Sequence, residues 1–491
     1  MKRHRTFQGF PTGLAVLLVC CILSTGCGRS ADNDLLPDQT DRLPESTEST
    51  ESMESAKSTE STESESSLAS EPAKKAFRYD PEIATRPVLP SISEKAARDQ
   101  GRDILTFMDV NTSTGAASFT EKCVTAFNKQ SEKYYIVLQN DTPSYGVALG
   151  TARDRLLVEL MAGKGPDIFY GALLPSPNNS ILDQGILLDL APMLDALGIT
   201  DEDYFPAARV LAKGEHVYGF APYLMAESYA VLDSVLDGRE QPDIYTLVEQ
   251  LYSYPDQTAV WWPGASYRTI LKFLLGGSED CWGMVDWESG RCDFSGEFFA
   301  KVLEVAKRYQ DPDMKGSTRV ISRYEPGSIG REDFERSGKF ILDFPFGDGW
   351  YPYCRSSYAY MVNGNTKYPE GVQEFLQFIF GEQGQNYAAA EFIVLPVSRD
   401  VAASYWALEL DLKHERYVTI DGELMEVLPT EEMMEADLDY AGRARYLPVN
   451  TAEIQSIILE EVDDFINGSK SLEMVCELIQ NRVQLYLDEN S

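Results

Sequence analysis

The sequence predicts an α/β fold, and three observations support this prediction. A helical stretch, a stop signal and a short buried strand follow one another directly between residues 156 and 170. Further strand-like and helical stretches alternate on both sides of that unit, which is typical of sheets covered by helices. The chain has 491 residues, enough for two separate cores once signal and linker segments are subtracted. We therefore expect two lobes.

The stretch from Leu156 to Pro192 shows the α/β pattern most clearly. Apolar residues at helical spacing precede Gly163, which tolerates the left-handed conformation that ends many helices, and Pro166 prevents continuation. Asp167 to Tyr170 then reads as a short buried strand. A loop rich in Pro, Asn and Ser follows, at the place where open α/β sheets carry ligand contacts.

This stretch, read as AGKGPDIF…DQGILLDLAPML, resembles the family 1 extracellular solute-binding proteins. These are the capture subunits of ABC importers, and most of them bind sugars. The resemblance covers about residue 103 to the end, and it implies a two-lobe periplasmic-binding-protein-like fold of type II, in which each lobe is a central sheet flanked by helices and several crossings form a hinge. Further pieces match in the same order at residues 218–222, 287–298, 338–344, 374–378 and 458–483.

The charge balance is strongly acidic. There are 43 Lys plus Arg against 78 Asp plus Glu, for a formal net charge of −35. Such a chain is repelled by phosphate backbones and by anionic lipid head groups, so we expect no nucleic-acid partner. An aromatic content of 11% leaves rings available for a binding cleft.

The amino terminus predicts export and lipid anchoring. Basic residues among the first five positions precede an apolar run, Gly13 to Leu23, that is too short to span a membrane comfortably. The small residues before Cys27 resemble a lipobox, which implies a signal peptide over 1–26 and acylation of Cys27, although Ser24 departs from the usual Leu. The alternative is an ordinary signal peptide with an incidental cysteine.

Residues 27–100 predict a disordered tether. Glu45 to Glu65 repeats Ser, Thr and Glu with almost no apolar residues, so it cannot bury enough surface to offset the entropy of ordering. A tether behind a lipidated cysteine is typical of a protein anchored on the extracellular face of a Gram-positive cell membrane. A periplasmic protein is the alternative.

Lobe one is expected to comprise residues 101–222 and 356–400. Strands are predicted at 103–108 and 134–138, with a helix at about 119–129 between them. The alternation implies a parallel sheet whose ligand edge lies at the carboxyl ends of the strands. After a stay in the other lobe, the chain returns with a strand near 358–362 and a helix at 370–380.

Lobe two is expected to comprise residues 223–355 and 401–491. The first crossover is placed at residues 218–223, and helices are predicted at 267–275 and 297–309. The carboxyl-terminal helices break at Gly468. Several crossings between lobes imply a hinge and closure around a ligand.

A sugar site combines aromatic platforms with carboxylates and amides, because sugars present apolar C–H faces and many hydroxyl groups. The candidates lie after the first strand, at the end of the 167–170 strand, beside the first crossover, and in two aromatic pairs. Each has a structural alternative: turn capping for the polar residues and core packing for the aromatic ones. Neighbouring residues of a strand point to opposite faces, so at most one of the two adjacent tryptophans should face the cleft. The predicted ligand contacts are Asp109, Asn111, Tyr170, Tyr223, Glu227, Trp261, Trp262, Trp350 and Tyr351.

Catalytic, cofactor and metal sites are not predicted. Val158 occupies the position where a phosphate-binding loop ending at Gly163-Lys164 needs glycine. Beyond the signal only His216 and His414 remain, and neither lies in a zinc-binding or triad spacing. Carboxylate pairs are uninformative among 78 acidic residues. Cys281 and Cys292 flank a turn and either form a disulfide or remain small buried residues.

The predicted function is therefore capture of a small solute, such as a sugar or oligosaccharide, and its delivery to ABC permease subunits. Neither enzyme activity nor a cofactor is expected, and the only membrane contact is the lipid anchor. Two alternatives remain open at this stage. One is a surface sensor that presents its closed form to a membrane signalling partner, and the other is a secreted glycoside hydrolase.

Overall fold

The structure is a computed structural model. It describes residues 77–109, 119–139, 147–174, 181–182, 184–238, 242–261, 264–310, 320–324, 339–354, 359–390, 395–413, 416–420, 423–447 and 451–490. Cys27 and the predicted signal peptide lie outside these ranges, so lipidation stays a prediction.

The first lobe is built on a six-stranded sheet. Strands β2, β1 and β3 are parallel, as predicted, but β15 pairs antiparallel with β3, and β4 pairs antiparallel with β5. The sheet is therefore mixed, because β15 enters after a long excursion through the other lobe instead of through a local helical crossover. The order is β2 (Tyr134–Gln139), β1 (Asp103–Met108), β3 (Ile168–Tyr170), β15 (Tyr360–Val362), β5 (His216–Phe220) and β4 (Arg209–Lys213).

Helices from both ends of the lobe-one sequence pack on this sheet and form its core. The ring of Phe375 lies 5.4 Å from that of Phe127 and 6.0 Å from that of Phe107, both in edge-to-face geometry. These contacts join α12 to α3 and β1. The helices of this lobe are α3 (Phe119–Gln130), α4 (Val147–Met161), α6 (Ala191–Ala196), α12 (Pro369–Ile379) and α13 (Glu382–Ala389), with the short 3-10 turns η1 (Gly171–Leu173) and η2 (Pro206–Ala208).

The segment 162–170, which leads from α4 into β3, is held in place by polar contacts to two neighbouring strands. Gly163 ends α4 with φ of 68°, as predicted. One carboxylate oxygen of Asp167 accepts hydrogen bonds from the backbone and side chain of Thr106 at 2.8 and 2.9 Å, and the other accepts one from Thr366 at 2.7 Å. Asn363 donates to the backbone oxygen of Lys164 at 2.9 Å. These polar residues fix β1, β3 and β15 in register, so their role is structural.

The second lobe has a five-stranded sheet around the long strand β7. Strands β10 and β11 pair antiparallel along one part of β7, and β14 pairs with its beginning. Strand β7 follows β5 of the first sheet closely, at the place where the sequence analysis puts the first crossover. The strands are β7 (Ala226–Leu232), β10 (Ile321–Tyr324), β11 (Lys339–Leu342), β14 (Tyr353–Cys354) and β19 (Arg445–Tyr446).

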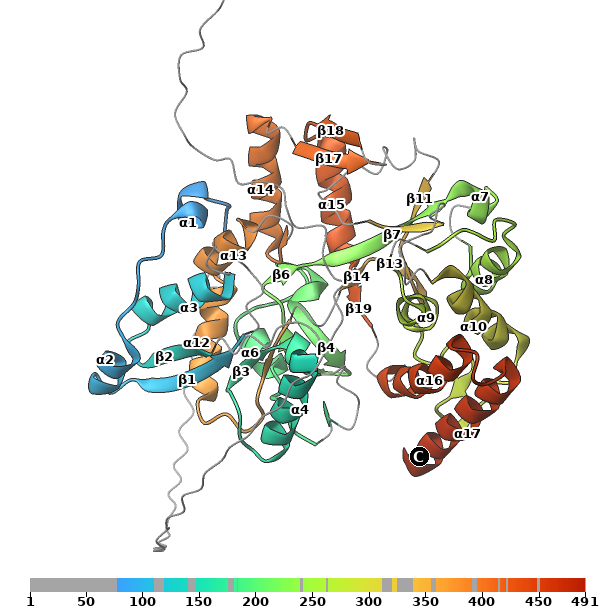
Figure 1. Ribbon diagram of the computed structural model, residues 1–491. Helices are drawn as coiled ribbons and strands as arrows, with labels where there is room; N and C mark the ends of the chain where they lie inside the picture. Colours follow the sequence, from blue (N-terminus) through green and yellow to red (C-terminus); the bar gives the residue numbers. More distant parts are fainter. Residues whose placement is uncertain are drawn as a thin grey trace, which may run out of the picture. The chain divides into compact units, whose positions relative to one another are not determined.

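The helices of the second lobe surround a separate core. Trp261, Phe273 and Tyr309 are fully buried there, with ring centroids of Trp261 and Phe273 5.3 Å apart. Helices α16 and α17 lie side by side next to α9 and α10 (Figure 1). These helices are α7 (Asp233–Leu236), α8 (Ile244–Ser253), α9 (Tyr267–Leu275), α10 (Glu297–Tyr309), α16 (Thr451–Ile466) and α17 (Leu472–Asn490).

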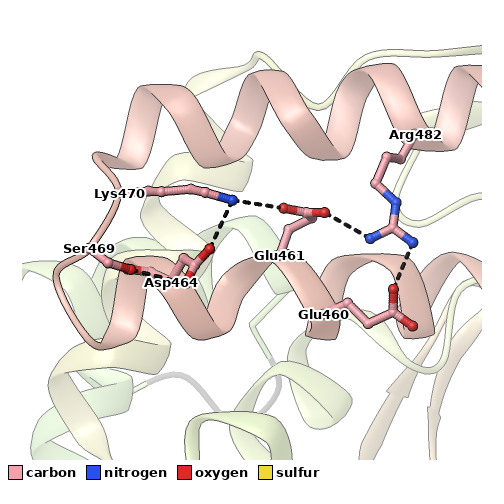
Figure 2. A network of polar contacts seen from close by, with 6 residues as sticks. All are labelled: Glu460, Glu461, Asp464, Ser469, Lys470 and Arg482. Carbon is pink, nitrogen blue, oxygen red and sulfur yellow. Dashed lines mark hydrogen bonds and ion pairs between the residues drawn. The ribbon is translucent and has the colours of Figure 1, made fainter.

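An ion network joins α16 to α17 across the turn at Gly468 (Figure 2). Glu461 lies at its centre, 3.4 Å from Lys470 and 2.8 Å from Arg482. Glu460 also pairs with Arg482 at 2.6 Å, and Asp464 with Lys470 at 2.8 Å. The predicted break between the two helices is thus confirmed, and the network fixes their packing.

The remaining elements are short helices, pairs of strands and the longer helices α14 and α15. They are α1 (Pro81–Thr85), α2 (Glu94–Asp99), β6 (Tyr223–Leu224) paired with β16 (Leu395–Pro396), β8 (Val285–Asp286) paired with β9 (Arg291–Cys292), β12 (Phe344–Phe346) paired with β13 (Gly349–Tyr351), α14 (Arg399–Leu412), β17 (Arg416–Ile420) paired with β18 (Glu423–Val427), and α15 (Glu431–Arg443).

The end of the predicted tether is folded, which corrects its boundary at residue 100. Helix α1 packs against α13, and α2 packs against β1 and β2. Asn386 accepts a hydrogen bond from the backbone of Asp80 at 2.5 Å and donates one to the backbone of Arg78 at 3.0 Å. Ala97 is fully buried. The segment from residue 77 onward is therefore part of lobe one.

Helix α15 also departs from the predicted division of the chain, which assigned 401–491 to lobe two. Its residues Tyr440 and Ala441 belong to the core of the first lobe. Arg443 ends α15 and Arg445 follows the helix, and both contact the second lobe. The side chain of Arg443 forms an ion pair with buried Asp343 at 2.8 Å. Helix α15 thus belongs to the crossing region and not to lobe two alone.

Candidate functional site

Several predicted ligand contacts meet at one edge of the first sheet. Strand β1 ends at Met108, directly before Asp109, and the parallel strand β3 ends at Tyr170. Tyr360 begins β15 opposite Tyr170, and it also pairs with Phe220 at the end of β5. The carboxyl ends of the parallel strands and the start of the antiparallel strand therefore share this edge, as the sequence analysis expected.

Tyr360 is the centre of this strand-end cluster, which we define as Asp109, Tyr170, Tyr223 and Tyr360. Its ring centroid lies 5.8 Å from that of Tyr170, and its hydroxyl is 2.8 Å from the hydroxyl of Thr120. Burial raises the pKa of Tyr360 well above its ordinary value of 10.0, and nearby Tyr223, Asp109 and Tyr170 contribute to this shift. The Tyr360 hydroxyl therefore stays protonated and serves as a hydrogen-bond donor or acceptor.

Asp109, which follows β1, and Tyr223, which begins β6, are the other two members of the cluster. Asp109 is 5% exposed, and Tyr223 is partly buried with its ring 5.2 Å from that of Phe119, edge to face. Three predicted residues from separate segments are thus brought together around one buried tyrosine. Aromatic surfaces, a carboxylate and phenol groups in one place can contact apolar faces and hydroxyl groups of a small polar solute.

The other predicted residues are placed as follows. Trp261 is fully buried in the core of the second lobe, so of the adjacent tryptophans it is the one that packs. Its neighbour Trp262 and also Asn111 lie outside the described residues. Glu227 pairs through its backbone with Tyr353 in the second sheet, and nothing is described of its side chain.

Trp350 and Tyr351 lie on the β12–β13 hairpin of the second lobe, and both are partly exposed. The guanidinium of Arg445 lies 3.4 Å from the centre of the Tyr351 ring and forms two contacts with Asp348 at 3.0 and 2.8 Å. This cation–π contact fixes Arg445, a residue of the crossing region, against the hairpin.

Two pockets border the hairpin. The larger, of about 860 Å³, is lined by Asp201 and Arg209 of the first lobe, by residues of the second lobe including Trp287, and by Arg445 and Tyr446 of the crossing region. The smaller, of about 460 Å³, is lined by Tyr245, Trp282 and Trp350 among others. Both volumes are within the range of pockets that hold small molecules.

The sequence analysis did not single out most of these pocket residues. Tyr245 and Trp282 come from segments with no recognisable motif, whereas Trp287 begins the 287–298 piece of the family resemblance but was not named as a ligand contact. Only the tertiary structure brings the three residues beside the hairpin. In the structure Trp287 is 36% exposed and Tyr245 50% exposed, which is unusual for large aromatic residues, but this exposure cannot be read from the sequence.

No metal site or disulfide emerges from the residues that the structure covers. Within these ranges no group of His, Cys, Asp and Glu side chains is placed to hold a metal ion. Cys281 and Cys292 are free thiols, and burial raises their pKa values to about 12 and about 11. The sequence left open whether these two cysteines form a disulfide, and in the structure they are unpaired. No helix in the described ranges is long and apolar enough to cross a membrane.

The fold matches solved structures, although no protein-family model and no curated protein sequence matches the chain. The sugar-binding protein MalE from Xanthomonas citri matches with a TM-score of 0.50 and 14% identity over 79% of this chain and 98% of MalE. A chitin oligosaccharide binding protein matches with a TM-score of 0.50 and 15% identity over 79% of this chain and 98% of its own. At these identities the matches establish the fold: this chain has the two-lobe α/β fold of MalE, as the resemblance implied.

Proposed function

We propose that this protein is a lipid-anchored extracellular solute-binding protein that captures a saccharide between its lobes and delivers it to an ABC permease. Acylation of Cys27 would hold it at the membrane, and the segment before residue 77 would act as the tether. The protein would bind its solute without converting it.

The observation that carries this proposal is the strand-end cluster in a fold of this type. Asp109, Tyr170 and Tyr223 come from separate segments and gather around Tyr360 at the edge where α/β sheets bind ligands. The chain also passes between the lobes before β7, at β14–β15 and near α15. Several crossings in a hinge permit closure of the lobes around a solute.

A thermal-shift screen of the full chain tests the proposal. Mono- and oligosaccharides are compared with amino acids, short peptides and polyamines as control solutes. A ligand at 100 times its Kd adds about 2.7 kcal/mol to the free energy of unfolding, enough for a visible rise in Tm. Each saccharide that raises Tm is then recovered and analysed by mass spectrometry.

A saccharide that raises Tm and is recovered unchanged is the expected result. A shift produced only by another class of solute would reject the carbohydrate assignment. Conversion of the saccharide into shorter products would reject a pure binding role. The delivery step is tested separately, by measuring saccharide uptake in cells with and without the gene.

A further inference from the structure

We propose that the solute is an oligosaccharide without anionic groups, and that its chain lies in one groove formed by the two pockets beside the β12–β13 hairpin. This inference rests on the proposed function and adds two properties to it, the length and the charge of the solute. We call the joined pockets the hairpin groove.

The two pockets are direct neighbours. Ser278, Asp280, Phe346 and Gly347 line both of them, so these four residues form the boundary that the larger and the smaller pocket share. The backbone of Gly347 donates a hydrogen bond to the oxygen of Gly277 at 3.1 Å, which holds the loop after α9 against the hairpin. A ligand that fills both pockets must therefore extend past the hairpin, which a single sugar ring does not do.

The larger pocket and the strand-end cluster both adjoin the first sheet, although no residue of the cluster lines either pocket. Arg209 lines the larger pocket and pairs through its backbone with buried Phe220, which pairs in turn with Tyr360. Tyr446 lines the same pocket, and the proximity of Tyr223 contributes, after burial, to a raised pKa of Tyr446. Trp350, predicted as a ligand contact, lines the smaller pocket.

Aromatic rings form the walls of the smaller pocket, and their polar groups are already used. The hydroxyl of Tyr245 donates to the backbone oxygen of Trp282 at 2.7 Å, and the indole nitrogen of Trp282 donates to the backbone oxygen of Leu274 at 2.7 Å. The ring of Tyr245 also packs 4.5 Å from that of Phe298. What these residues present to the pocket is therefore ring surface, which suits the C–H faces of sugars.

The charges of the groove exclude anions. Its two guanidinium groups are neutralised, since Arg209 pairs with Asp195 at 2.7 Å and Arg445 with Asp348 at 2.8 Å. The other carboxylates of the lining are Asp201, Asp243, Glu279 and Asp280, and none of them pairs with a cation of the described residues. Carboxylates accept hydrogen bonds from neutral hydroxyl or amino groups, whereas an anionic sugar would be repelled.

Titration calorimetry with the full chain tests both properties. The probes are neutral gluco- and N-acetylchito-oligosaccharides of two to six units, chitosan oligomers of the same lengths as amino sugars, and oligogalacturonates as anions of matched length. We expect affinity to rise at least tenfold from the dimer to the tetramer in a neutral or amino series. We expect oligogalacturonates to bind at least tenfold more weakly than that series.

Two substitutions place the effect in the groove. Tyr245→Ala should weaken binding of the preferred tetramer at least tenfold, whereas Tyr252→Ala should leave it unchanged. Tyr252 is the matched control because it lies on the same helix α8, is 41% exposed and lines neither pocket. Asp280→Asn preserves the shape of the side chain and should narrow the difference between neutral and anionic tetramers. Thermal unfolding of each variant checks that it is folded.

The outcomes separate this inference from the proposed function. Saccharide binding that is equal for dimers and tetramers, or equal for neutral and anionic tetramers, overturns the inference and leaves the function intact. Equal tetramer affinities of folded Tyr245→Ala and Tyr252→Ala also overturn it. If no saccharide of any length binds, the proposed function itself fails.

Discussion

At the scale of single residues, Tyr170 is the member of the strand-end cluster whose proposed contact with the ligand is the most informative to test. It ends β3 and lies beside buried Tyr360, so its ring is held in place while part of it stays exposed. If the ring is a platform for a sugar, Tyr170→Phe should keep most of the saccharide affinity and Tyr170→Ala should lose at least tenfold. Titration calorimetry measures both. Equal affinity of the two variants would contradict a stacking role.

Gly277 is required by close packing under the hairpin groove. A Cβ atom at this position would lie 1.7 Å from the backbone oxygen of Pro345, so an alanine must displace β12. We expect Gly277→Ala to lower Tm and to weaken oligosaccharide binding. Gly296→Ala is the control, because its Cβ would meet no atom within 4 Å and its φ of −72° suits any residue. Unchanged Tm and affinity in Gly277→Ala would show that the loop is not packed as described.

Asp189 gives a pH dependence with a defined sign. Burial raises its pKa, but hydrogen bonds from His216 and from the backbone of Val217 and Ala191 outweigh burial and lower the pKa below 3.8. A carboxyl group with a depressed folded-state pKa contributes stability above the unfolded-state value, and this is lost as pH falls through the folded-state value. Asp189→Asn should therefore reduce the free energy of unfolding at pH 7, with a difference that shrinks below pH 3.8.

Urea unfolding of wild type and Asp189→Asn at pH 7, 5 and 3 provides the measurement. A difference between the two proteins that is the same at pH 7 and pH 3 would show that the carboxylate charge does not matter. The backbone N–H groups of Ala191 and Val217 both donate to Asp189 at 3.0 Å, so the carboxylate connects the start of α6 to β5. Loss of its charge should therefore destabilise lobe one.

At the scale of elements, the α16–α17 pair depends on the ion network in Figure 2. Glu461 has a side chain that is 15% exposed and contacts both Lys470 and Arg482. Glu461→Gln should lower Tm in 50 mM salt, and the loss should be smaller in 1 M salt, because salt screens partly exposed ion pairs. Glu477→Gln, at an exposed position of α17, is the control, with no expected change. A loss that is independent of salt would point to packing and not to charge.

Element boundaries could be predicted where local signals agreed. The predicted ranges of α9 and α10 match the structure exactly, because apolar spacing is clear in both and Ser266 caps the first turn of α9. The folded segment from residue 77 was missed because α1 and α2 are short and bury mainly alanines, such as Ala84 and Ala97. Such contacts leave no periodic pattern. The direction of β15 was also missed, since a return from another lobe has no local signal.

The residues of the candidate site also divide into those that could be predicted from the sequence and those that could not. Asp109, Tyr170 and Tyr223 could be found from their positions beside predicted strands and the crossover. The sequence analysis did not find the pocket residues Tyr245, Trp282 and Trp287. They lie on α8, in the loop after α9 and between β8 and β9, and these segments meet beside the β12–β13 hairpin only through tertiary packing. For two adjacent tryptophans the sequence does not show which ring is buried and which is available to a ligand. The structure buries Trp261.

At the scale of the whole molecule, the two-lobe fold has several crossings between the lobes, and the proposed ligand contacts come from both lobes. Arg443, Arg445 and Tyr446 of the crossing region contact elements of both lobes, so a change in lobe packing would alter the contacts of this segment along with those of the other crossings. Capture of a saccharide should therefore change the shape of the protein as well as its stability.

Small-angle X-ray scattering of the full chain, with and without a saturating oligosaccharide from the thermal-shift screen, tests this central claim most directly. We expect a smaller radius of gyration in the presence of the saccharide, a return to the original value when the saccharide is removed, and recovery of the saccharide unchanged. A radius of gyration that stays the same while calorimetry shows the protein to be saturated would contradict capture by closure of the lobes.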